Sequence, residues 1–484
     1  MAEQKYRNSV TLFLPFIDDE ENSFDKIRKK ITLSNEWQLC KDKIRYMHRY
    51  ITEKFDTSDQ NTCQCFHYKL DNQFREKYNI LPADALYVAI EWPKASDPPF
   101  FGFYLEDIDI FCFSTEVNIM ALRLRFTEQD SYRIAAAEYC VKKVANTSIL
   151  PADGESKNGS ITLQRMAENI TKTLTDSADF FFFANRKSGR ANILTYLEVP
   201  KKDNYTEELY FMKHAYGSGF HYYETQKAIE LENFALTDDV TWGITTEAVV
   251  CLVCPERGRK DFLENVFYNN FHNEYFFMYT LLLHQKYMLY KLLTKIGRGS
   301  LNTHETLVAY RDELYEFETD FVFSHITEVP QYQLLYSRIV EVFALRAMYE
   351  DVHEPLVSLR EVRSDEERRA REEEQRAREE ERIAREEEQR QQEAHNARFE
   401  STLGLLSILG IFSALVDSFD FAGEFFAWCR GEQSSAIPVF RVLFLVVVVI
   451  ISCFVLWNVV PHLIRNFKKN RQIKKDRENS RDGE

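Results

Sequence analysis

Three carboxylates interrupt a segment that is otherwise apolar enough to enter a membrane. The stretch SILGIFSALVDSFDFAGEF, residues 407–425, begins with small and apolar residues and then contains Asp417, Asp420 and Glu424. At 100° per residue the three acids fall in one band of a helix surface, roughly 80° wide. A stripe of this kind can line a cation pathway, because carboxylates inside a membrane are tolerated where they face water. The alternative is that the helix ends near Val416 and that the acids belong to a solvated loop.

The cysteines offer incomplete metal sites. Cys251 and Cys254 form a Cys-x-x-Cys pair without a second pair or nearby histidines, so a buried strand is the alternative to a zinc site. Cys63, Cys65 and His67 likewise lack a fourth ligand. Neither set is a confident metal site.

A second group of residues could bind an organic ligand. The segment HAYGSGFHYYET, residues 214–225, combines aromatic side chains, two histidines and two glycines, which could stack on and hydrogen-bond an adenine-containing molecule. A surface loop with ordinary tyrosine packing is the alternative. The motifs of hydrolases, metalloproteases and dinucleotide-binding enzymes are missing from the sequence, so we do not expect an enzyme. The candidate ligand-binding residues are His214, Tyr216, Gly217, His221 and Tyr222.

Composition limits the class of protein. With 484 residues, 45% hydrophobic and 14% aromatic, the chain can build a large core. A net charge of −15 argues against direct DNA or RNA binding, which depends on Lys and Arg neutralising phosphates. Nine irregularly spaced cysteines are typical of a reducing compartment, and the N-terminus does not have the pattern of a secretory signal.

The C-terminal part predicts membrane insertion. Residues 442–460 are uncharged and almost wholly apolar, long enough to cross a bilayer as a helix. The basic run at residues 465–477 places the C-terminus in the cytoplasm by the positive-inside rule. If the large N-terminal part is also cytoplasmic, a second span is required. We therefore expect a multi-pass protein of the cell inner membrane with both termini in the cytoplasm.

The order of elements predicts an α/β domain, then long helices, then two spans. Alternating apolar runs read as strands up to about residue 260, and the pattern is helical from Asp261 to Phe399. The apolar helix 275–293 contains three basic residues and is read as a core helix. The predicted parts are a cytoplasmic α/β domain (1–260), its helical part (261–354), a charged stalk helix (355–398), a pore-lining transmembrane helix 1 (399–426), a short external loop (427–437), transmembrane helix 2 (438–462) and a basic cytoplasmic tail (463–484).

The charged tract at residues 369–394 predicts a rigid helix. Its Glu and Arg residues form i,i+4 pairs in the favourable order, such as Glu374 with Arg378, each stabilising by roughly 0.2–0.5 kcal/mol. Alanines recur every seven residues, but the heptads carry too little apolar surface for a tight coiled coil. The helix is therefore either a solvated single helix or a stalk that continues into the first span.

With this order of elements the chain resembles the CorA family of magnesium channels over roughly residues 260–475. Members have two C-terminal spans and a Gly-Met-Asn motif that closes the first. Ile411 and Phe412 match an Ile-Phe pair of that span, and Gly423, Glu424 and Phe425 stand at the motif's position, where only the glycine is kept. The resemblance implies metal ion transport, with Mg²⁺ or a similar divalent cation as a permeant or regulatory ion. Selectivity for magnesium does not carry over, because a Phe side chain cannot accept hydrogen bonds from the ion's water.

Upstream segments are similar to CorA-like membrane proteins associated with type III CRISPR systems, a branch without that motif. They are WGITTE at 242–247, the helix at 274–292 and FETDFVFSHITEVPQYQLLY at 317–336. This resemblance implies an antiviral defence effector opened by a nucleotide second messenger, of the cyclic-oligoadenylate or SAM-AMP type.

Together the resemblances imply a homopentamer in the lipid bilayer, with the first span lining the pore. The expected function is a ligand-gated cation channel or transporter. The alternative is a membrane-anchored sensor or scaffold that perturbs the bilayer without selective ion transport. The expected pore residues are Thr402, Leu406, Leu409, Ser413, Asp417, Asp420 and Glu424.

Overall fold

The structure is a computed structural model, and the chain divides into two compact units, residues 1–363 and 364–484. The residues that the structure describes are 6–18, 23–41, 44–57, 63–90, 100–152, 160–175, 177–184, 189–217, 219–297 and 304–429, together with positions 446, 447, 449, 450, 453, 454 and 457.

In the described part of the first unit, thirteen strands form one mixed sheet. Its main path runs β11-β12-β13-β10-β1-β6-β5-β4-β7-β8, while β3 also pairs with β5, β2 with β3 and β9 with β1. The pairs are antiparallel except β10 with β13, which is parallel. The strands are β1 (Asn8–Asp18), β2 (Trp37–Leu39), β3 (Cys65–Leu70), β4 (Leu86–Ile90), β5 (Phe100–Phe113), β6 (Val117–Phe126), β7 (Ser148–Pro151), β8 (Ile161–Thr162), β9 (Ala178–Phe180), β10 (Asn192–Glu198), β11 (Asn233–Thr237), β12 (Val240–Ile244) and β13 (Ala248–Val253).

The central strands are apolar on both faces because each face packs on a separate core. On β1, Leu12 and Leu14 belong to one hydrophobic core and Phe13 belongs to the other. On β13, Val250 and Cys251 divide in the same way. Successive side chains of a strand point to opposite faces, so a run of buried residues in a row requires a cover on each side.

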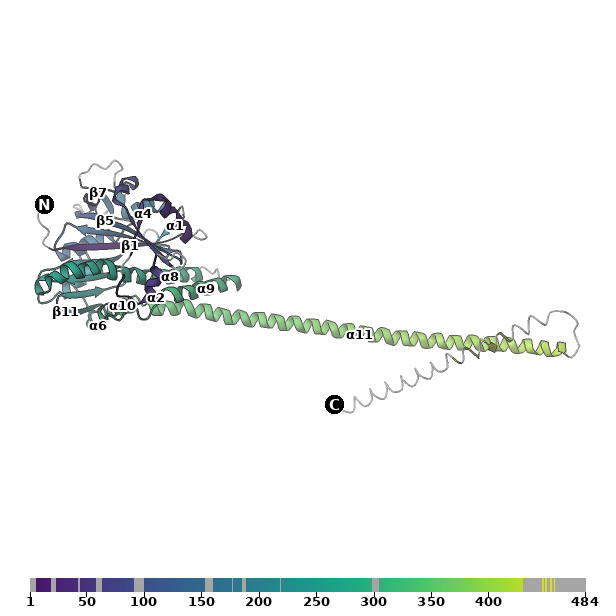
Figure 1. Ribbon diagram of the computed structural model, residues 1–484. Coiled ribbons are helices and arrows are strands. Elements are labelled where there is room, and N and C mark those ends of the chain that lie inside the picture. The colour runs from purple at the N-terminus through teal and green to yellow at the C-terminus, as the bar shows by residue number, and fades with distance from the viewer. Residues whose placement is uncertain are drawn as a thin grey trace. The chain divides into compact units, whose positions relative to one another are not determined.

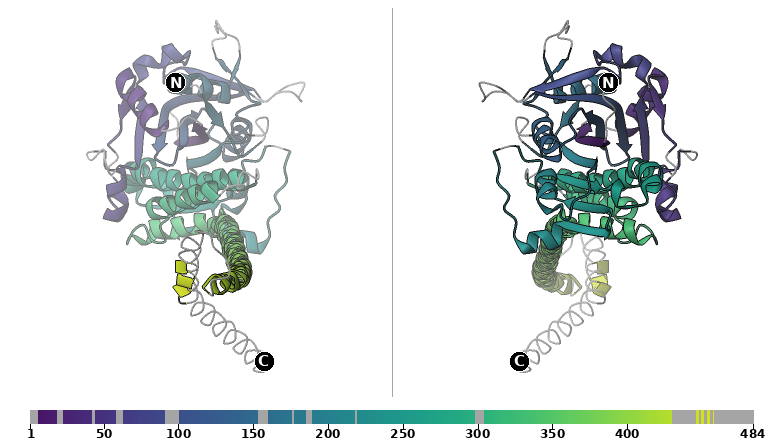
Figure 2. Two further views of the ribbon diagram at one scale, coloured as in Figure 1. Left: turned by 90° about the vertical axis from the view of Figure 1, so that its right-hand side faces the viewer. Right: turned by 90° about the vertical axis from the view of Figure 1, so that its left-hand side faces the viewer.

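Helices supply both covers. Helices α1, α3, α4 and α5 contribute buried residues to the first core, and α2, α8, α9, α10 and the first turns of α11 contribute to the second. The sheet is therefore the middle layer of this unit, and α8 to α10 form a layer along one side of it (Figures 1 and 2). The α-helices are α1 (Ser23–Ser34), α2 (Arg49–Thr52), α3 (Ser131–Val141), α4 (Leu163–Thr171), α5 (Thr206–His214), α6 (Gln226–Glu232), α7 (Tyr268–Asn270), α8 (Phe276–Gly297), α9 (His304–Phe321), α10 (Pro330–Val342) and α11 (Leu345–Cys429).

Five shorter helical elements complete the list. Two π-helical turns flank α7 and lead into α8, and three 3₁₀ turns lie among the strands. They are η1 (Glu53–Phe55), η2 (Asn72–Tyr78), η3 (Pro255–Arg257), η4 (Phe262–Phe267) and η5 (Phe271–Tyr275).

Helix α8 is a core helix, as the sequence predicts, and its buried basic side chains each have at least one polar contact. The Nε2 atom of His284 lies 2.6 Å from the hydroxyl of Thr115. Lys286 donates to the carbonyl of Thr246 at 2.8 Å, and Lys291 donates to the carbonyl of Thr115 at 2.7 Å. Burial nevertheless lowers the pKa of Lys286 to about 8.

Helix α11 runs through Pro355 without ending there, and its part in the second unit is strongly charged. The predicted ion pair of Glu374 with Arg378 forms at 2.6 Å and that of Glu381 with Arg385 at 2.5 Å. Both pairs are exposed, so each adds only a few tenths of a kcal/mol to the helix.

The prediction of two C-terminal transmembrane helices, 399–426 and 438–462, is contradicted. Of the helices in the described residues, none is both long enough and apolar enough to cross a bilayer. In α11 the uncharged residues 401–416 rise only about 24 Å along the axis, less than the roughly 30 Å of a hydrocarbon layer, before the acids begin. The fold class predicted for this region and the inner-membrane location are therefore wrong. With them, the description as a pentameric, magnesium-transporting ion channel loses its basis.

Parts of the C-terminal prediction fall beyond the described residues. These are most of the second span at 438–462, residues 430–437 of the external loop and the basic tail at 463–484.

Candidate ligand pocket

A pocket of about 250 Å³ lies in the first unit, where α8, α9, α10 and the first turns of α11 meet. The loop between α9 and α10 closes part of its wall. Its lining combines an apolar surface with a few converging polar groups, as in small-molecule sites. The lining residues that carry the argument are Gln285, Leu289, Phe317, Glu318, Phe323, Tyr336, Val340, Leu345, Arg346, Tyr349 and Glu350.

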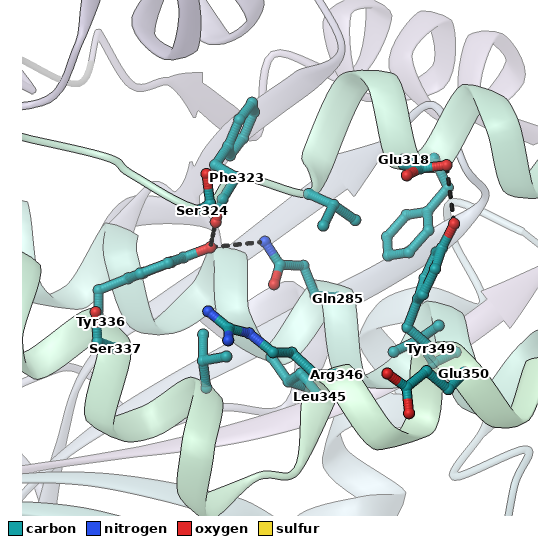
Figure 3. Close-up of a pocket in the computed structure, with 14 residues that line it drawn as sticks. Gln285, Glu318, Phe323, Ser324, Tyr336, Ser337, Leu345, Arg346, Tyr349 and Glu350 are labelled. Carbon is teal, nitrogen blue, oxygen red and sulfur yellow. Dashed lines mark hydrogen bonds between the residues drawn. The ribbon is translucent and has the colours of Figure 1, made fainter.

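Hydrogen bonds fix one end of the pocket to the loop after α9. The hydroxyl of Tyr336 donates to the carbonyl of Phe323 at 2.6 Å. The side-chain amide of Gln285 donates to the carbonyl of Phe321 and lies 3.3 Å from the Tyr336 oxygen. Gln285, Tyr336 and Arg346 lie together at this end, and Tyr349 with Glu318 lies at the other (Figure 3). Because Gln285 and Tyr336 are already held, this wall is formed before any ligand arrives.

Two phenols of the pocket remain protonated at neutral pH. Burial raises the pKa of Tyr336 to about 12. Burial, together with the hydrogen bond that Tyr349 donates to Glu318 at 2.9 Å, raises the pKa of Tyr349 to about 12. Both hydroxyls therefore act as neutral hydrogen-bonding groups, and the charge in the pocket comes from other side chains.

The charged groups of the pocket have both signs. Arg346 is exposed at the start of α11 and forms no ion pair within the described residues. Glu318 and Glu350 are the two carboxylates of the lining. A guanidinium binds carboxylates or phosphates, and a carboxylate binds ammonium groups. The pocket can therefore hold a molecule that carries both charges beside an apolar body.

The described lining of the pocket contains no Ser–His or Cys–His pair. None of the described residues that line it is a histidine, cysteine or lysine. Ser324 and Ser337 belong to the lining, but no imidazole accompanies them to act as a base. A nucleophile and a general base are the minimum for acyl or phosphoryl transfer by a serine, so the lining offers no such chemistry.

The predicted adenine-binding residues form a stack of their own. The ring of His214 lies parallel to that of Tyr216 at 4.9 Å, and Tyr216 stacks on Phe220 at 4.3 Å. A side chain at Gly217 would approach the ring of Tyr139 to 3.3 Å. His214 and Phe220 stack on the ring of Tyr216, so an adenine would have to displace one of them.

The other members of this predicted group lie apart from the stack. Tyr222 contacts the edge of Tyr210 at 5.0 Å, and His221 is exposed. Burial and the neighbouring Lys213 lower the pKa of His214 to about 4, so it is neutral at pH 7. Ligand binding by this segment stays a prediction.

The predicted pore residues all belong to α11. Thr402, Leu406, Leu409 and Ser413 are exposed on it, and the hydroxyl of Thr402 donates to a backbone carbonyl one turn earlier at 2.6 Å. For five further predicted residues the structure describes the helical backbone but not the side chains: Asp417, Asp420, Gly423, Glu424 and Phe425.

Neither Cys251 with Cys254 nor Cys63 and Cys65 with His67 is arranged as a zinc site. Cys251 and Cys254 are both buried, but Cys251 packs in the core beneath α8 and Cys254 packs in the opposite core. Their thiols therefore lie on different sides of the sheet and cannot share one ion. Cys63 donates to the carbonyl of Cys65 at 3.1 Å, and His67 pairs with an aspartate on β5.

The sequence did not predict that the residues lining the ligand pocket form one site. They come from four helices and the loop after α9, between residues 285 and 350, and no motif spacing connects them. Aromatic and polar residues inside the segment 317–336 were the available signal. Comparison with known proteins adds no name, because no family model, no curated protein and no solved structure matches the chain.

Proposed function

We propose that residues 1–363 form a ligand-binding regulatory domain, with the ligand in the four-helix pocket and α11 as the responding element. The observation that carries this proposal is that the first turns of α11 supply part of the pocket wall through Leu345, Arg346 and Tyr349. A bound molecule would contact α11 and the body of the domain at once. It would therefore favour whichever position of α11 makes the better contacts.

The lining favours a small zwitterion with an apolar body, of which the hydrophobic and aromatic amino acids are examples. Arg346 would hold a carboxylate, and Glu318 or Glu350 would hold an ammonium group. Leu289, Phe317 and other apolar residues provide a surface for the side chain of the ligand. One cation against two carboxylates is a poor match for a polyanionic nucleotide messenger, so that predicted ligand is not part of this proposal.

The connection between α10 and α11 supports the coupling. Ala344, which joins the two helices, has a φ of 53°, a left-handed conformation that costs a non-glycine residue roughly 1–2 kcal/mol. Its neighbours Phe343 and Leu345 are buried, and their packing holds the turn in place. Because Leu345 also lines the pocket, a ligand would pack directly against the residue that follows the strained turn.

The predicted alternative, a sensor or scaffold, is of the same kind as this proposal. The membrane anchor of that alternative is left out, because none of the described helices is both long enough and apolar enough to cross a bilayer.

The test is a binding screen with the full chain and the twenty common amino acids. We expect at least one hydrophobic or aromatic amino acid to raise the midpoint of thermal unfolding and to bind in calorimetry. Arg346→Met should weaken its affinity about tenfold or more, which corresponds to about 1.4 kcal/mol. Arg338→Met is the matched control, since Arg338 is on α10 outside the pocket and pairs with Glu341 at 3.4 Å.

Two outcomes would contradict the proposal. In the first, no member of the panel binds. In the second, Arg346→Met and Arg338→Met change the affinity equally. Hydrogen exchange tests the coupling: on binding, the amides of residues 345–363 should exchange more slowly than in the free protein, while those of α1 should not change.

A further inference from the structure

Two histidines and a glutamate from distant parts of the sequence converge beside α2. His48 comes directly before α2, and His325 and Glu328 lie in the loop between α9 and α10. One nitrogen or oxygen from each side chain lies within 4.8 Å of the others. Imidazole and carboxylate are common ligands of first-row transition metals.

The distances within this cluster suit metal ligands better than hydrogen bonds. The Nε2 atoms of His48 and His325 each lie 3.7 Å from the same oxygen of Glu328, too far for a hydrogen bond. Ligands bound to a tetrahedral ion at 2.0–2.2 Å are separated from each other by roughly 3.3–3.6 Å. The two rings are 5.4 Å apart between centroids, so both can turn a nitrogen to one point.

The backbone around the three side chains is held in place. The amide of His48 donates to the carbonyl of Ile326 at 2.9 Å, and the amide of Ile326 donates to the side chain of Gln333 at 2.9 Å. The hydroxyls of Tyr50 and Thr327 add further hydrogen bonds between the two segments. A site on a prearranged backbone loses less entropy when the ion binds.

We propose that His48, His325 and Glu328 bind a divalent transition metal, with Zn²⁺ as the ion that fits best. Two imidazoles and one carboxylate are a ligand set for zinc and disfavour Mg²⁺ or Ca²⁺, which prefer oxygen ligands. Glu328 is 83% exposed and His325 is 51% exposed, so the fourth position is open to water or to a group from another molecule.

In the two other clusters of metal-binding residues in the described part of the chain, candidate ligand atoms already contact other groups. In one, the Nε2 atom of His67 is hydrogen-bonded to Asp109 at 2.9 Å, and the ring lies on Phe111. In the other, the buried ammonium of Lys213 forms ion pairs with both carboxylates beside His214, Glu224 and Glu232. A metal ion in either cluster would have to displace these contacts.

The proposed metal site stands on residues outside the ligand pocket and does not depend on the proposed function. It shares a loop with the pocket, however, since Phe323 and Ser324 line the pocket and His325 follows them. If both proposals hold, a metal ion would fix the loop against the segment around His48. The pocket wall would then be more rigid, and ligand affinity would change with metal.

The test measures metal binding by the full chain, without a histidine tag and after treatment with a chelator. We expect one equivalent of Zn²⁺ in calorimetry and the visible absorption of tetrahedral Co²⁺ in a titration with cobalt. His48→Gln and His325→Gln should each weaken Zn²⁺ binding at least tenfold, and Glu328→Gln should weaken it less. Binding should also slow hydrogen exchange of the amides in residues 322–329.

Two controls separate this site from other metal binding. His353→Gln removes an exposed histidine on α11, and Cys40→Ser removes a member of the cluster around His67. Both variants should bind zinc as the unchanged protein does. The proposal fails if neither metal binds, if His48→Gln and His325→Gln bind normally, or if Cys40→Ser alone abolishes binding. Because these assays contain no organic ligand, their outcome is independent of the pocket.

Discussion

Two apolar helical segments of this chain have opposite surroundings. Helix α8 is buried over most of its length and carries His284, Lys286 and Lys291 inside the domain. Residues 401–416 of α11 contain no charge, yet Leu406 and Leu409 are each 64% exposed there. The charged helix is in the core and the uncharged one is not.

The difference teaches that apolarity alone does not decide what a helix packs against. In α8 the buried lysines have partners across the interface: the carbonyl of Thr246 for Lys286, and the carboxylate of Glu313, 2.9 Å from Lys291. Burying a charge is tolerable when its hydrogen bonds are replaced. In the described part of α11, Gly410 has no atom within 4 Å of the position that a side chain would take.

The largest effect should come from removing apolar volume at matched positions of the two helices. Leu283 is fully buried on α8, so Leu283→Ala should lower the free energy of unfolding by about 4 kcal/mol, from lost burial and the cavity left behind. Leu409→Ala on α11 should change it by less than about 0.5 kcal/mol. Urea unfolding, followed by circular dichroism, measures both. Equal losses in the two variants would remove the distinction between the helices.

The next effect concerns the buried cation of α8 and depends on pH. Lys286 has a pKa of about 8 in the folded protein, below its ordinary 10.5, so between these values the unfolded chain binds more protons. Stability contributed by this residue should therefore rise with pH from about 8 to 10.5, by about 3 kcal/mol in total.

Comparison with Lys286→Met isolates this contribution. The difference in unfolding free energy between the unchanged protein and the variant should grow in favour of the unchanged protein across this range. Lys260→Met, at an exposed lysine, is the control and should not show this growth. If the difference in unfolding free energy between the unchanged protein and Lys286→Met does not vary with pH, the lysine is not desolvated.

The smallest effect lies in the charged part of α11. Glu374→Gln removes the exposed pair with Arg378 and should reduce helix stability by about 0.3 kcal/mol, with the effect vanishing at high salt. Circular dichroism of a peptide spanning residues 364–398, at low and high salt, measures this. Glu380→Gln is a fitting control, because no ion pair of Glu380 occurs within the described residues. A loss that salt does not remove would point to helix propensity instead of charge.

Local patterns predicted many of the elements correctly. Alternating apolar runs predicted strands in the first 260 residues, and the runs at residues 11–16, 100–113 and 117–126 lie in β1, β5 and β6. Alternation and β-branched residues are local signals, so they need no knowledge of the rest of the fold. The core position of 275–293 was also recognised, because its basic residues argued against lipid.

The remaining features depend on contacts between distant residues. The stalk helix was predicted to begin at residue 355, but α11 begins at Leu345 and continues through Pro355. The pocket is built from four helices and the loop after α9. The cluster around His48 joins this residue to His325 and Glu328, which are hundreds of residues away in the sequence. The segment at 399–426 was predicted as a span because a second crossing was required to keep both termini in the cytoplasm, and its acids were assigned to a pore.

The division of cysteines between the two cores has a practical consequence for following how the sheet opens. Cys112 on β5 and Cys251 on β13 are both fully buried. Burial raises the pKa of the Cys112 thiol to about 12. A thiol reagent can modify them only when the strands separate. Cys251 and Cys254 lie in different cores. Modification of Cys251 would report that the layer with α8 has loosened, and modification of Cys254 that the opposite layer has loosened. The chain thus carries built-in chemical reporters on both sides of its sheet.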